Sequence, residues 1–237
     1  MLLQSDSIRV KVCGVREPAE AAALDALGVD WIGFNFHPGS ARYVTPEAAA
    51  LMAKALTRAQ PVGVFVDAPV DHVISVANAT GIRWIQLHGG EDWDYVRRMP
   101  LPVIKAIPHT RLADWGGLRP GVEAALAAGS GPRGAGSASP LAYFLVDTAA
   151  GKSFGGTGQA FDWDLLRAYP LPLPIFLAGG LGPENLAAAL KAKPFAVDLN
   201  SKVELAPGKK DLAKVQACLS TLSAINAINA AEFRPRS

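Results

Sequence analysis

An α/β fold in which short strands alternate with helices is the fold class that this sequence predicts. Three observations predict it: eight short runs of β-branched and other apolar residues, longer Ala- and Leu-rich stretches between them, and 50% hydrophobic content in a chain of 237 residues. Eight strand–helix units over roughly 210 residues favour a closed (β/α)8 barrel, the TIM barrel, over an open doubly wound sheet. We therefore expect one barrel domain across residues 1–237, with its core at about residues 8–222.

The expected strands are short and almost continuously apolar. Parallel strands that helices cover have both faces buried, and they therefore lack the alternation of a half-exposed strand. In chain order they are Ile8–Gly14, Trp31–Phe36, Val62–Val66, Arg83–His88, Pro102–Ile107, Tyr143–Asp147, Pro174–Gly180 and Phe195–Asn200.

The clearest helices have apolar residues at helical spacing between these strands. Thr45 before Pro46 is typical of an N-cap followed by proline at the first helical position, and Gly28 and Gly81 stand where helices should end. The helices so predicted are Glu17–Leu27, Pro46–Leu56, Pro69–Thr80 and Pro183–Lys191.

One segment interrupts the alternation. Residues 128–140 are rich in Gly, Ser and Ala and have no periodic apolar face, which predicts a flexible surface loop before the sixth strand. The residues after Leu222 are expected to extend the last helix and to fray near Pro235.

Charge and cysteine content exclude several kinds of partner. Lys and Arg number 23 against 21 Asp and Glu, with no basic run, so nucleic acid is not an expected partner. Cys13 and Cys218 lack CxxC spacing and a nearby His pair, which argues against a zinc site or a disulfide and fits a reducing cytoplasm. No signal-peptide pattern and no apolar run of about 18 residues appears, so a membrane partner is not expected either.

Polar residues at the C-terminal ends of barrel strands are candidates for catalysis, because active sites of this fold lie there. Cys13 ends the first strand beside Gly14, but a buried thiol is often only a small apolar residue, so position alone leaves its role open. Asp147 ends the sixth strand, where a buried carboxylate must be paired or used; on sequence alone, a loop hydrogen bond explains it equally well. Gln86 and His88 end the fourth strand.

Glycine-rich turns after the sixth and seventh strands favour a phosphate site. Residues 155–158, which include Gly156, and residues 178–182, which include Gly179 and Gly180, offer backbone N–H groups to an anion; Ser201 follows the eighth strand. This is the usual phosphate corner of such barrels. Arg42, after the second strand, carries a fork that can hold a carboxylate, although a single arginine is more often a surface residue. No metal-ligand spacing, Walker loop or nucleophile elbow appears, so we expect no metal and no cofactor.

A set of motifs in fixed order carries a resemblance to one family. They are KVCGV, GFNFHPGSARYVT, VGVFVD, IQLHG, PVIKAI, FGGTGQAFDW, LAGGLGPENL and ELAPGKKD, from Lys11 to about Leu222. In this combination the chain resembles phosphoribosylanthranilate isomerases, (β/α)8-barrel enzymes of tryptophan biosynthesis.

The resemblance implies a cofactor-independent Amadori rearrangement of N-(5-phosphoribosyl)anthranilate. It implies that Cys13 is the general base, that Asp147 is the general acid and that Arg42 holds the anthranilate carboxylate. It also implies that the segments containing Gly156, Gly179, Gly180 and Ser201 bind the phosphate. The partner is then a small phosphorylated substrate, and the protein a monomer or homodimer.

Three departures from the family pattern stand out. Lys202 replaces a glycine after Ser201, which puts the backbone angles of that turn in doubt; we expect its ammonium to point to solvent and to add only screened attraction for the phosphate. Asn35 is polar at a strand position that is commonly apolar, and the loop at residues 128–140 is longer than usual.

Two alternatives remain open. A histidine-pathway aminoaldose isomerase would share the phosphate corner, but such enzymes have a two-aspartate arrangement, against which Cys13 counts. A catalytically silent sugar-phosphate-binding barrel is the alternative from another class; the presence of both Cys13 and Asp147 argues against it.

Overall fold

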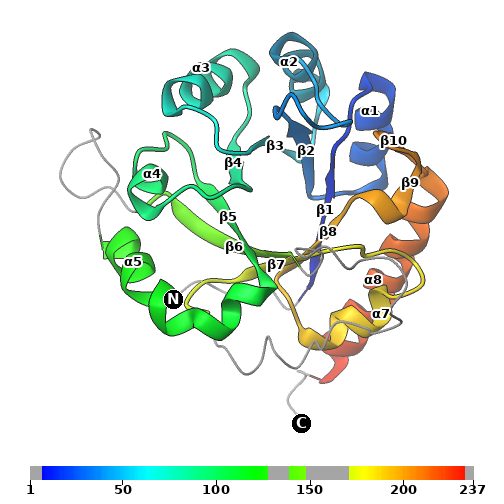
Figure 1. Cartoon of the computed structure of the whole chain (residues 1–237). Helices are drawn as coiled ribbons and strands as arrows, with labels where there is room; N and C mark the ends of the chain where they lie inside the picture. The colour runs from blue at the N-terminus through cyan, green and yellow to red at the C-terminus, as the bar shows by residue number, and fades with distance from the viewer. Residues whose placement is uncertain (1–6, 128–138, 148–170, 233–237) are drawn as a thin grey trace.

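Eight parallel strands close into a barrel in the order in which they follow one another in the chain, with β8 paired back to β1. The computed structural model describes residues 7–127, 139–147 and 171–232. Figure 1 shows the ring of strands with the helices around it. The predicted (β/α)8 barrel is confirmed. Its strands are β1 (Arg9–Cys13), β2 (Trp31–Asn35), β3 (Gln60–Phe65), β4 (Trp84–Leu87), β5 (Val103–Pro108), β6 (Leu141–Asp147), β7 (Ile175–Ala178) and β8 (Ala196–Leu199).

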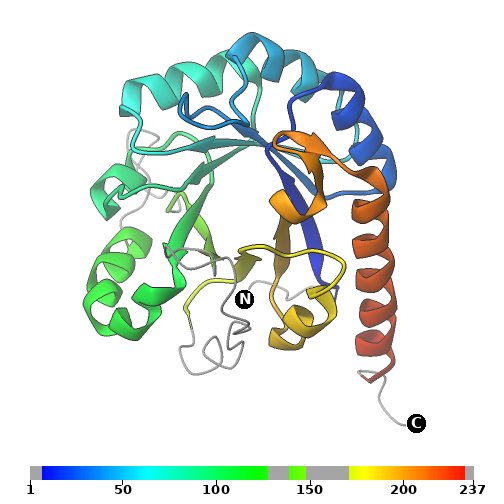
Figure 2. The same ribbon diagram turned by 45° about the vertical axis from the view of Figure 1, so that its right-hand side comes forward.

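The helices lie outside the strands in both views of the molecule (Figures 1 and 2). An antiparallel hairpin, β9 (Glu204–Ala206) with β10 (Lys209–Lys210), follows β8 and was not predicted. The α-helices are α1 (Pro18–Leu27), α2 (Pro46–Ala55), α3 (Val70–Thr80), α4 (Trp93–Arg97), α5 (Trp115–Ala127), α7 (Leu186–Ala189) and α8 (Leu212–Glu232). The 3-10 helices are η1 (His109–Asp114), η2 (Leu190–Ala192) and η3 (Ser201–Val203).

The capping signals of the sequence are confirmed. The Thr45 hydroxyl accepts a hydrogen bond from the Ala48 N–H at 3.3 Å, with Pro46 at the first helical position of α2. Gly28 and Gly81 end α1 and α3 with φ values of 89° and 71°, a conformation in which a side chain would be strained. Helix α8 extends beyond Leu222, as expected.

The helix predicted over Pro183–Lys191 is wrong in its length. Helix α7 spans only four residues and continues as η2. The cause is Asn185, whose amide accepts from the Gly182 N–H at 2.9 Å and donates to the Gly180 carbonyl at 2.9 Å. These side-chain bonds hold the preceding segment as a turn, because Asn competes for backbone groups that a helix would use.

Alternate strand residues face the barrel interior and the surrounding helices, as the pleat of a strand requires. On β1, Val10 and Val12 pack in the main core between strands and helices. A second cluster lies inside the ring and includes Trp31, Ile104, Leu145 and Phe176. The alternation therefore directs Cys13 at the end of β1, and Asp147 at the end of β6, toward the interior.

The predicted loop at residues 128–140 lies outside the described residues except for its last two positions, Ser139 and Pro140. In the described part of the chain, no helix is long and apolar enough to cross a membrane.

Candidate active site

Cys13 lies at the C-terminal end of β1 with 6% of its surface exposed. Its partner in the neighbouring strand is Gly33, and a Cβ atom there would lie 3.0 Å from the Cys13 Sγ and 3.3 Å from the Lys11 Nζ. A side chain at position 33 would therefore crowd both the thiol and the ammonium. Gly14 follows with a φ of 77°, so the chain turns away immediately after the thiol.

A buried ion pair lies directly beneath the thiol. Lys11 on β1 donates from Nζ to both carboxylate oxygens of Asp198 on β8, at 2.9 and 3.0 Å, and both side chains are buried. Burial alone would lower the pKa of Lys11, but Asp198 outweighs it and the pKa is raised. Lys11 is therefore a fixed cation inside the barrel.

The ionisation of Cys13 depends on opposing effects. Burial raises the pKa of the thiol, the Lys11 ammonium lowers it, and the Asp198 carboxylate raises it again. The net result in the protein without substrate is a raised pKa. Lys11 is thus the group that favours the thiolate most strongly.

Asp147 ends β6, as predicted, and its carboxylate contacts a histidine. The Asp147 Oδ2 lies 3.3 Å from the His88 Nε2, and the His88 Nδ1 lies 2.9 Å from the Gln86 Nε2. The backbone carbonyl of Asp147 lies 3.3 Å from the Nδ1 of His109 at the start of η1. The sequence placed Gln86 and His88 at the end of the fourth strand without a role, and the contact of His88 with Asp147 across β5 becomes visible only in three dimensions.

A cavity of about 520 Å³ opens beside Asp147 over the ends of β4, β5 and β6. His88 and Asp147 both line it, and Trp93, Ile107 and Leu118 supply apolar walls. Its volume lies in the range of small-molecule sites.

The guanidinium of Arg42, which was expected to hold a substrate carboxylate with its fork, already pairs with a carboxylate of the protein. Its Nε and Nη2 donate to the two carboxylate oxygens of Glu204 on β9, at 2.8 and 2.6 Å. The pair leaves both N–H groups of Nη1 and the second N–H of Nη2 for another acceptor. A Cβ at Gly14 would lie 2.5 Å from the Arg42 Cδ, so the arginine stem passes over the turn that follows Cys13.

Lys210 completes the charged cluster at this edge. Its buried Nζ donates to the Glu204 Oε1 at 2.7 Å and to the Asn200 Oδ1 at 3.0 Å. Burial lowers the pKa of Lys210, against the opposing effect of Glu204. Neither Glu204 nor Lys210 was predicted, although both lie in the ELAPGKKD motif. Their signal was the motif, since periodicity cannot show which charges become buried.

Asn35, which departs from the family pattern, holds the loop that carries Arg42. Its Nδ2 donates to the Ser40 Oγ at 3.2 Å, its Oδ1 accepts from the His37 N–H at 2.8 Å, and the Ser40 Oγ accepts from the Arg42 N–H at 3.1 Å. A polar residue at this strand end is therefore explained by loop closure.

The predicted phosphate segments after β7 and β8 lie next to each other. Gly179 and Gly180 have φ values of 103° and 63°, and a Cβ at Gly182 would lie 2.9 Å from the Lys202 Cβ. Ser201 begins η3. Gly156 lies outside the described residues.

Lys202, which stands where the family pattern has glycine, does not adopt the positive φ that would favour glycine. It is absent from the described non-glycine residues with positive φ, which are Asp67 and Lys193. Its side chain is 57% exposed, and its Nζ lies 3.6 Å from the Glu184 Oε1. The side chain of Lys202 is therefore largely exposed, and its screened attraction for a phosphate stays a prediction.

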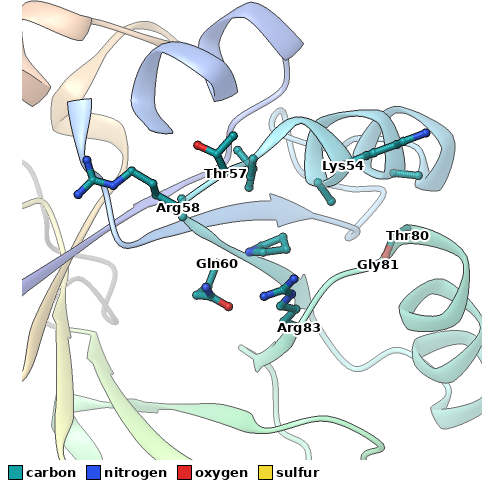
Figure 3. Close-up of a pocket in the computed structure, with 12 residues that line it drawn as sticks. Lys54, Thr57, Arg58, Gln60, Thr80, Gly81 and Arg83 are labelled. Atoms are coloured by element: carbon teal, nitrogen blue, oxygen red, sulfur yellow. The ribbon is translucent and has the colours of Figure 1, made fainter. Parts of the chain in front are cut away.

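A second cavity, of about 310 Å³, lies at the other end of the barrel near the starts of β3 and β4 (Figure 3). Lys54 and Arg58 extend to opposite sides in that view and do not converge on a common point. Because active sites of this fold lie at the C-terminal ends of the strands, this cavity is not part of the candidate site. In the described part of the chain, no group of three His, Cys, Asp or Glu side chains is arranged as metal ligands.

A closed barrel with a thiol, a carboxylate and glycine-rich turns at the C-terminal ends of its strands defines an enzyme of the (β/α)8-barrel class. Residues 10–119 and 134–221 match the family N-(5'phosphoribosyl)anthranilate (PRA) isomerase. The chain belongs to this family and is an isomerase.

Individual relatives agree with this assignment. The N-(5'-phosphoribosyl)anthranilate isomerase of Myxococcus xanthus is 39% identical over 223 residues, which cover 93% of this chain and 98% of the relative. A crystal structure of phosphoribosyl anthranilate isomerase from Thermotoga maritima is 31% identical, with a TM-score of 0.77 over 92% of this chain and 99% of that one. Another is a complex of phosphoribosyl anthranilate isomerase with reduced 1-(o-carboxyphenylamino)-1-deoxyribulose 5-phosphate, with 29% identity, a TM-score of 0.74 and the same coverage.

Proposed function

We propose that Cys13 and Asp147 are the base and the acid with which this chain converts N-(5-phosphoribosyl)anthranilate into 1-(2-carboxyphenylamino)-1-deoxyribulose 5-phosphate, the Amadori rearrangement of tryptophan biosynthesis. The observation that carries the assignment is that both residues end their strands, β1 and β6, at the C-terminal side of the barrel, at positions whose side chains face the interior. Around the ring these strands are separated by β7 and β8, so acid and base approach a bound sugar from different directions.

Ring opening is the step for Asp147. Its protonated carboxyl gives a proton to the furanose oxygen as the bond from C1 to that oxygen breaks, and the nitrogen lone pair forms a C1=N bond. The iminium then makes the C2 proton acidic. Cys13 removes that proton, and the electron pair forms a C1=C2 bond and neutralises the nitrogen. Ketone formation follows as the C2 hydroxyl loses its proton and C1 takes up the proton that Cys13 carries, which restores the thiolate.

Lys11 supports the base role of Cys13. A thiolate rather than a thiol removes the C2 proton, and burial opposes its formation. The Lys11 ammonium is the largest of the effects that lower the pKa of Cys13, and Asp198 holds that ammonium in place. Lys11 and Asp198 act on the base without touching the substrate.

Substrate binding is assigned to both ends of the site. Arg42, fixed by Glu204, presents its Nη1 to the anthranilate carboxylate. Backbone N–H groups near Gly156, Gly179, Gly180 and Ser201 bind the phosphate, with Lys202 adding attraction that salt screens. A small phosphorylated substrate is therefore the partner.

Assembly is inferred from a relative, and location from the state of the cysteines. We infer a monomer or a homodimer; an isomerase of Thermotoga maritima is described as dimeric. We also infer the cytoplasm as its location, because its two described cysteines are unpaired and buried.

The test is a fluorescence assay that follows loss of phosphoribosylanthranilate on mixing with the purified protein, without added metal or cofactor. Cys13→Ala and Asp147→Asn should each lower kcat by on the order of 10²-fold or more. Cys218→Ala and Asp71→Asn serve as matched controls, because Cys218 packs in the outer core and Asp71 is exposed on α3. Near-normal turnover of either site variant at saturating substrate would overturn its role.

A further inference from the structure

Three polar side chains form a row inside the barrel mouth. Gln86 on β4 contacts His88 just after that strand, with 2.9 Å between Nε2 and Nδ1. The other ring nitrogen of His88, Nε2, lies 3.3 Å from the Asp147 Oδ2. Asp147 comes from β6, so the row joins two strands that β5 separates.

The amide of Gln86 has an unused end. The residue is 1% exposed, and its Oε1 has no hydrogen-bond partner within the described part of the chain. Buried polar atoms are nearly always paired, so an exception points to a second state or a function. The two ends of an amide have almost the same shape, and a half-turn exchanges the Nε2 donor for the Oε1 acceptor next to His88.

Each orientation of the amide suits a different state of His88. With Nε2 toward the ring, as in the structure, the His88 Nδ1 accepts and the ring N–H is at Nε2, which lies 3.3 Å from the Asp147 Oδ2. With Oε1 toward the ring, Nδ1 carries a proton and donates to the amide. The His88 Nε2 can then share a proton with the Asp147 Oδ2.

We propose that His88, oriented by Gln86, is a positioning residue that shares the proton of Asp147 and thereby keeps this side chain available as an acid. This proposal deepens the proposed function and rests on it. The shared proton leaves Asp147 for the furanose oxygen as the bond from C1 breaks. It is replaced when the C2 hydroxyl loses its proton during ketone formation, so the pair returns to its starting state.

Other charged groups line the cavity near the pair, of which Arg111 is exposed. Glu91, Asp92, Lys105 and Arg111 line the same cavity. Glu91 and Lys105 form their own ion pair at 2.7 Å, and the Asp92 carboxylate caps α4 through the Tyr95 N–H. From η1, His109 contacts the backbone carbonyl of Asp147. Among these groups Asp147 is the carboxylate in contact with His88.

The experiment compares the pH dependence of kcat in three variants. His88→Asn keeps a polar side chain but cannot take up a proton, so kcat should fall about tenfold with KM within about threefold, and the alkaline limb should move to lower pH. Gln86→Glu should move the same limb to higher pH, because a carboxylate next to Nδ1 favours a protonated ring. His72→Asn is the matched control, since His72 is exposed on α3.

Opposite shifts of the alkaline limb support the proposal, because a merely structural contact would not produce them. Gln86→Met, which lacks both amide ends, replaces Gln86→Glu if thermal melting shows that the buried carboxylate unfolds the protein. The proposal then expects the alkaline limb to move to lower pH in both Gln86→Met and His88→Asn. An unchanged pH profile in His88→Asn overturns the proposal. If His88→Asn has an unchanged pH profile but Asp147→Asn loses turnover, the proposed function still holds and only the role of His88 is wrong. If Asp147→Asn stays active, both the proposed function and the role of His88 are wrong.

Discussion

Breaking the ion pair beneath Cys13 should destabilise the protein strongly. The Lys11 Nζ lies 2.9 Å from the Asp198 Oδ1, and both side chains are buried. At an effective dielectric constant of about 20, this attraction is roughly 6 kcal/mol before the cost of burial is subtracted. Lys11→Met leaves the carboxylate without its partner, which typically costs about 3–5 kcal/mol. At about 2–4 °C per kcal/mol, Tm should fall by roughly 6–20 °C.

Urea unfolding followed by circular dichroism measures this loss, and a double variant tests its cause. Lys11→Met combined with Asp198→Val removes both charges, so most of the stability should return. Arg119→Met is the matched control, because Arg119 and Glu123 lie 2.7 Å apart but are both exposed, and its effect should stay below about 1 kcal/mol. A loss below about 1 kcal/mol in Lys11→Met, or a double variant as unstable as the sum of the single ones, would refute the reasoning.

The same substitution should change the pH dependence of turnover. Burial raises the pKa of Cys13 and Lys11 opposes that effect, so removing Lys11 raises the thiol pKa further. A smaller fraction of thiolate at neutral pH then lowers kcat, and the loss should diminish as the pH rises toward the new pKa. If kcat at neutral pH is unchanged in Lys11→Met, the ammonium does not activate the thiol.

Three other perturbations test separate parts of the structure. Arg42→Ala should raise KM by roughly 10- to 150-fold, the equivalent of about 1.5–3 kcal/mol for a charge-assisted contact; an unchanged KM means that another group holds the carboxylate. Lys202→Gly should change KM by less than about tenfold, and by less at high salt, because its side chain is exposed; a larger change that persists in salt would indicate a direct phosphate contact. Asp25→Asn should cost about 1–2 kcal/mol at pH 7 by urea unfolding. Burial would raise the pKa of Asp25, but hydrogen bonds from Ala59, Thr57 and Arg58 outweigh it and lower the pKa to about 2. This stabilisation is present above the ordinary pKa near 4 and is lost as the pH falls through about 2, so a difference that stays constant down to pH 2 would contradict it.

Two groups of largely buried charges lie at the C-terminal end of this barrel: the Lys11–Asp198 pair, and Glu204 with Lys210 and Arg42. Lys11, Asp198, Glu204 and Lys210 have little or no exposed side-chain surface. Each is paired, which limits the cost of removing charge from water. The pairs fix cations near the thiol and the arginine without leaving a free charge in the core.

Much of the fold was predictable from local patterns. All eight predicted strands lie within two residues of the observed ends, because continuous apolar runs bounded by turns mark buried parallel strands. Helix starts and stops at Thr45, Gly28 and Gly81 were equally visible. The helix after β7 was predicted too long. The spacing of apolar residues does not show the hydrogen bonds by which the Asn185 side chain holds its preceding residues in a turn.

The sequence by itself determined the order of strands and helices, the placement of Cys13 and Asp147 at strand ends, and the family to which the chain belongs. Local spacing and motif order carry that information, because they depend on residues that are close in the chain. Only the tertiary structure decided which charges meet: Lys11 bonds Asp198 across 187 positions, and Arg42 bonds Glu204 across 162. Closure of the barrel brings β1 beside β8 and places the hairpin after β8 over the β2–α2 loop, and no periodicity along the chain specifies a pairing at that separation.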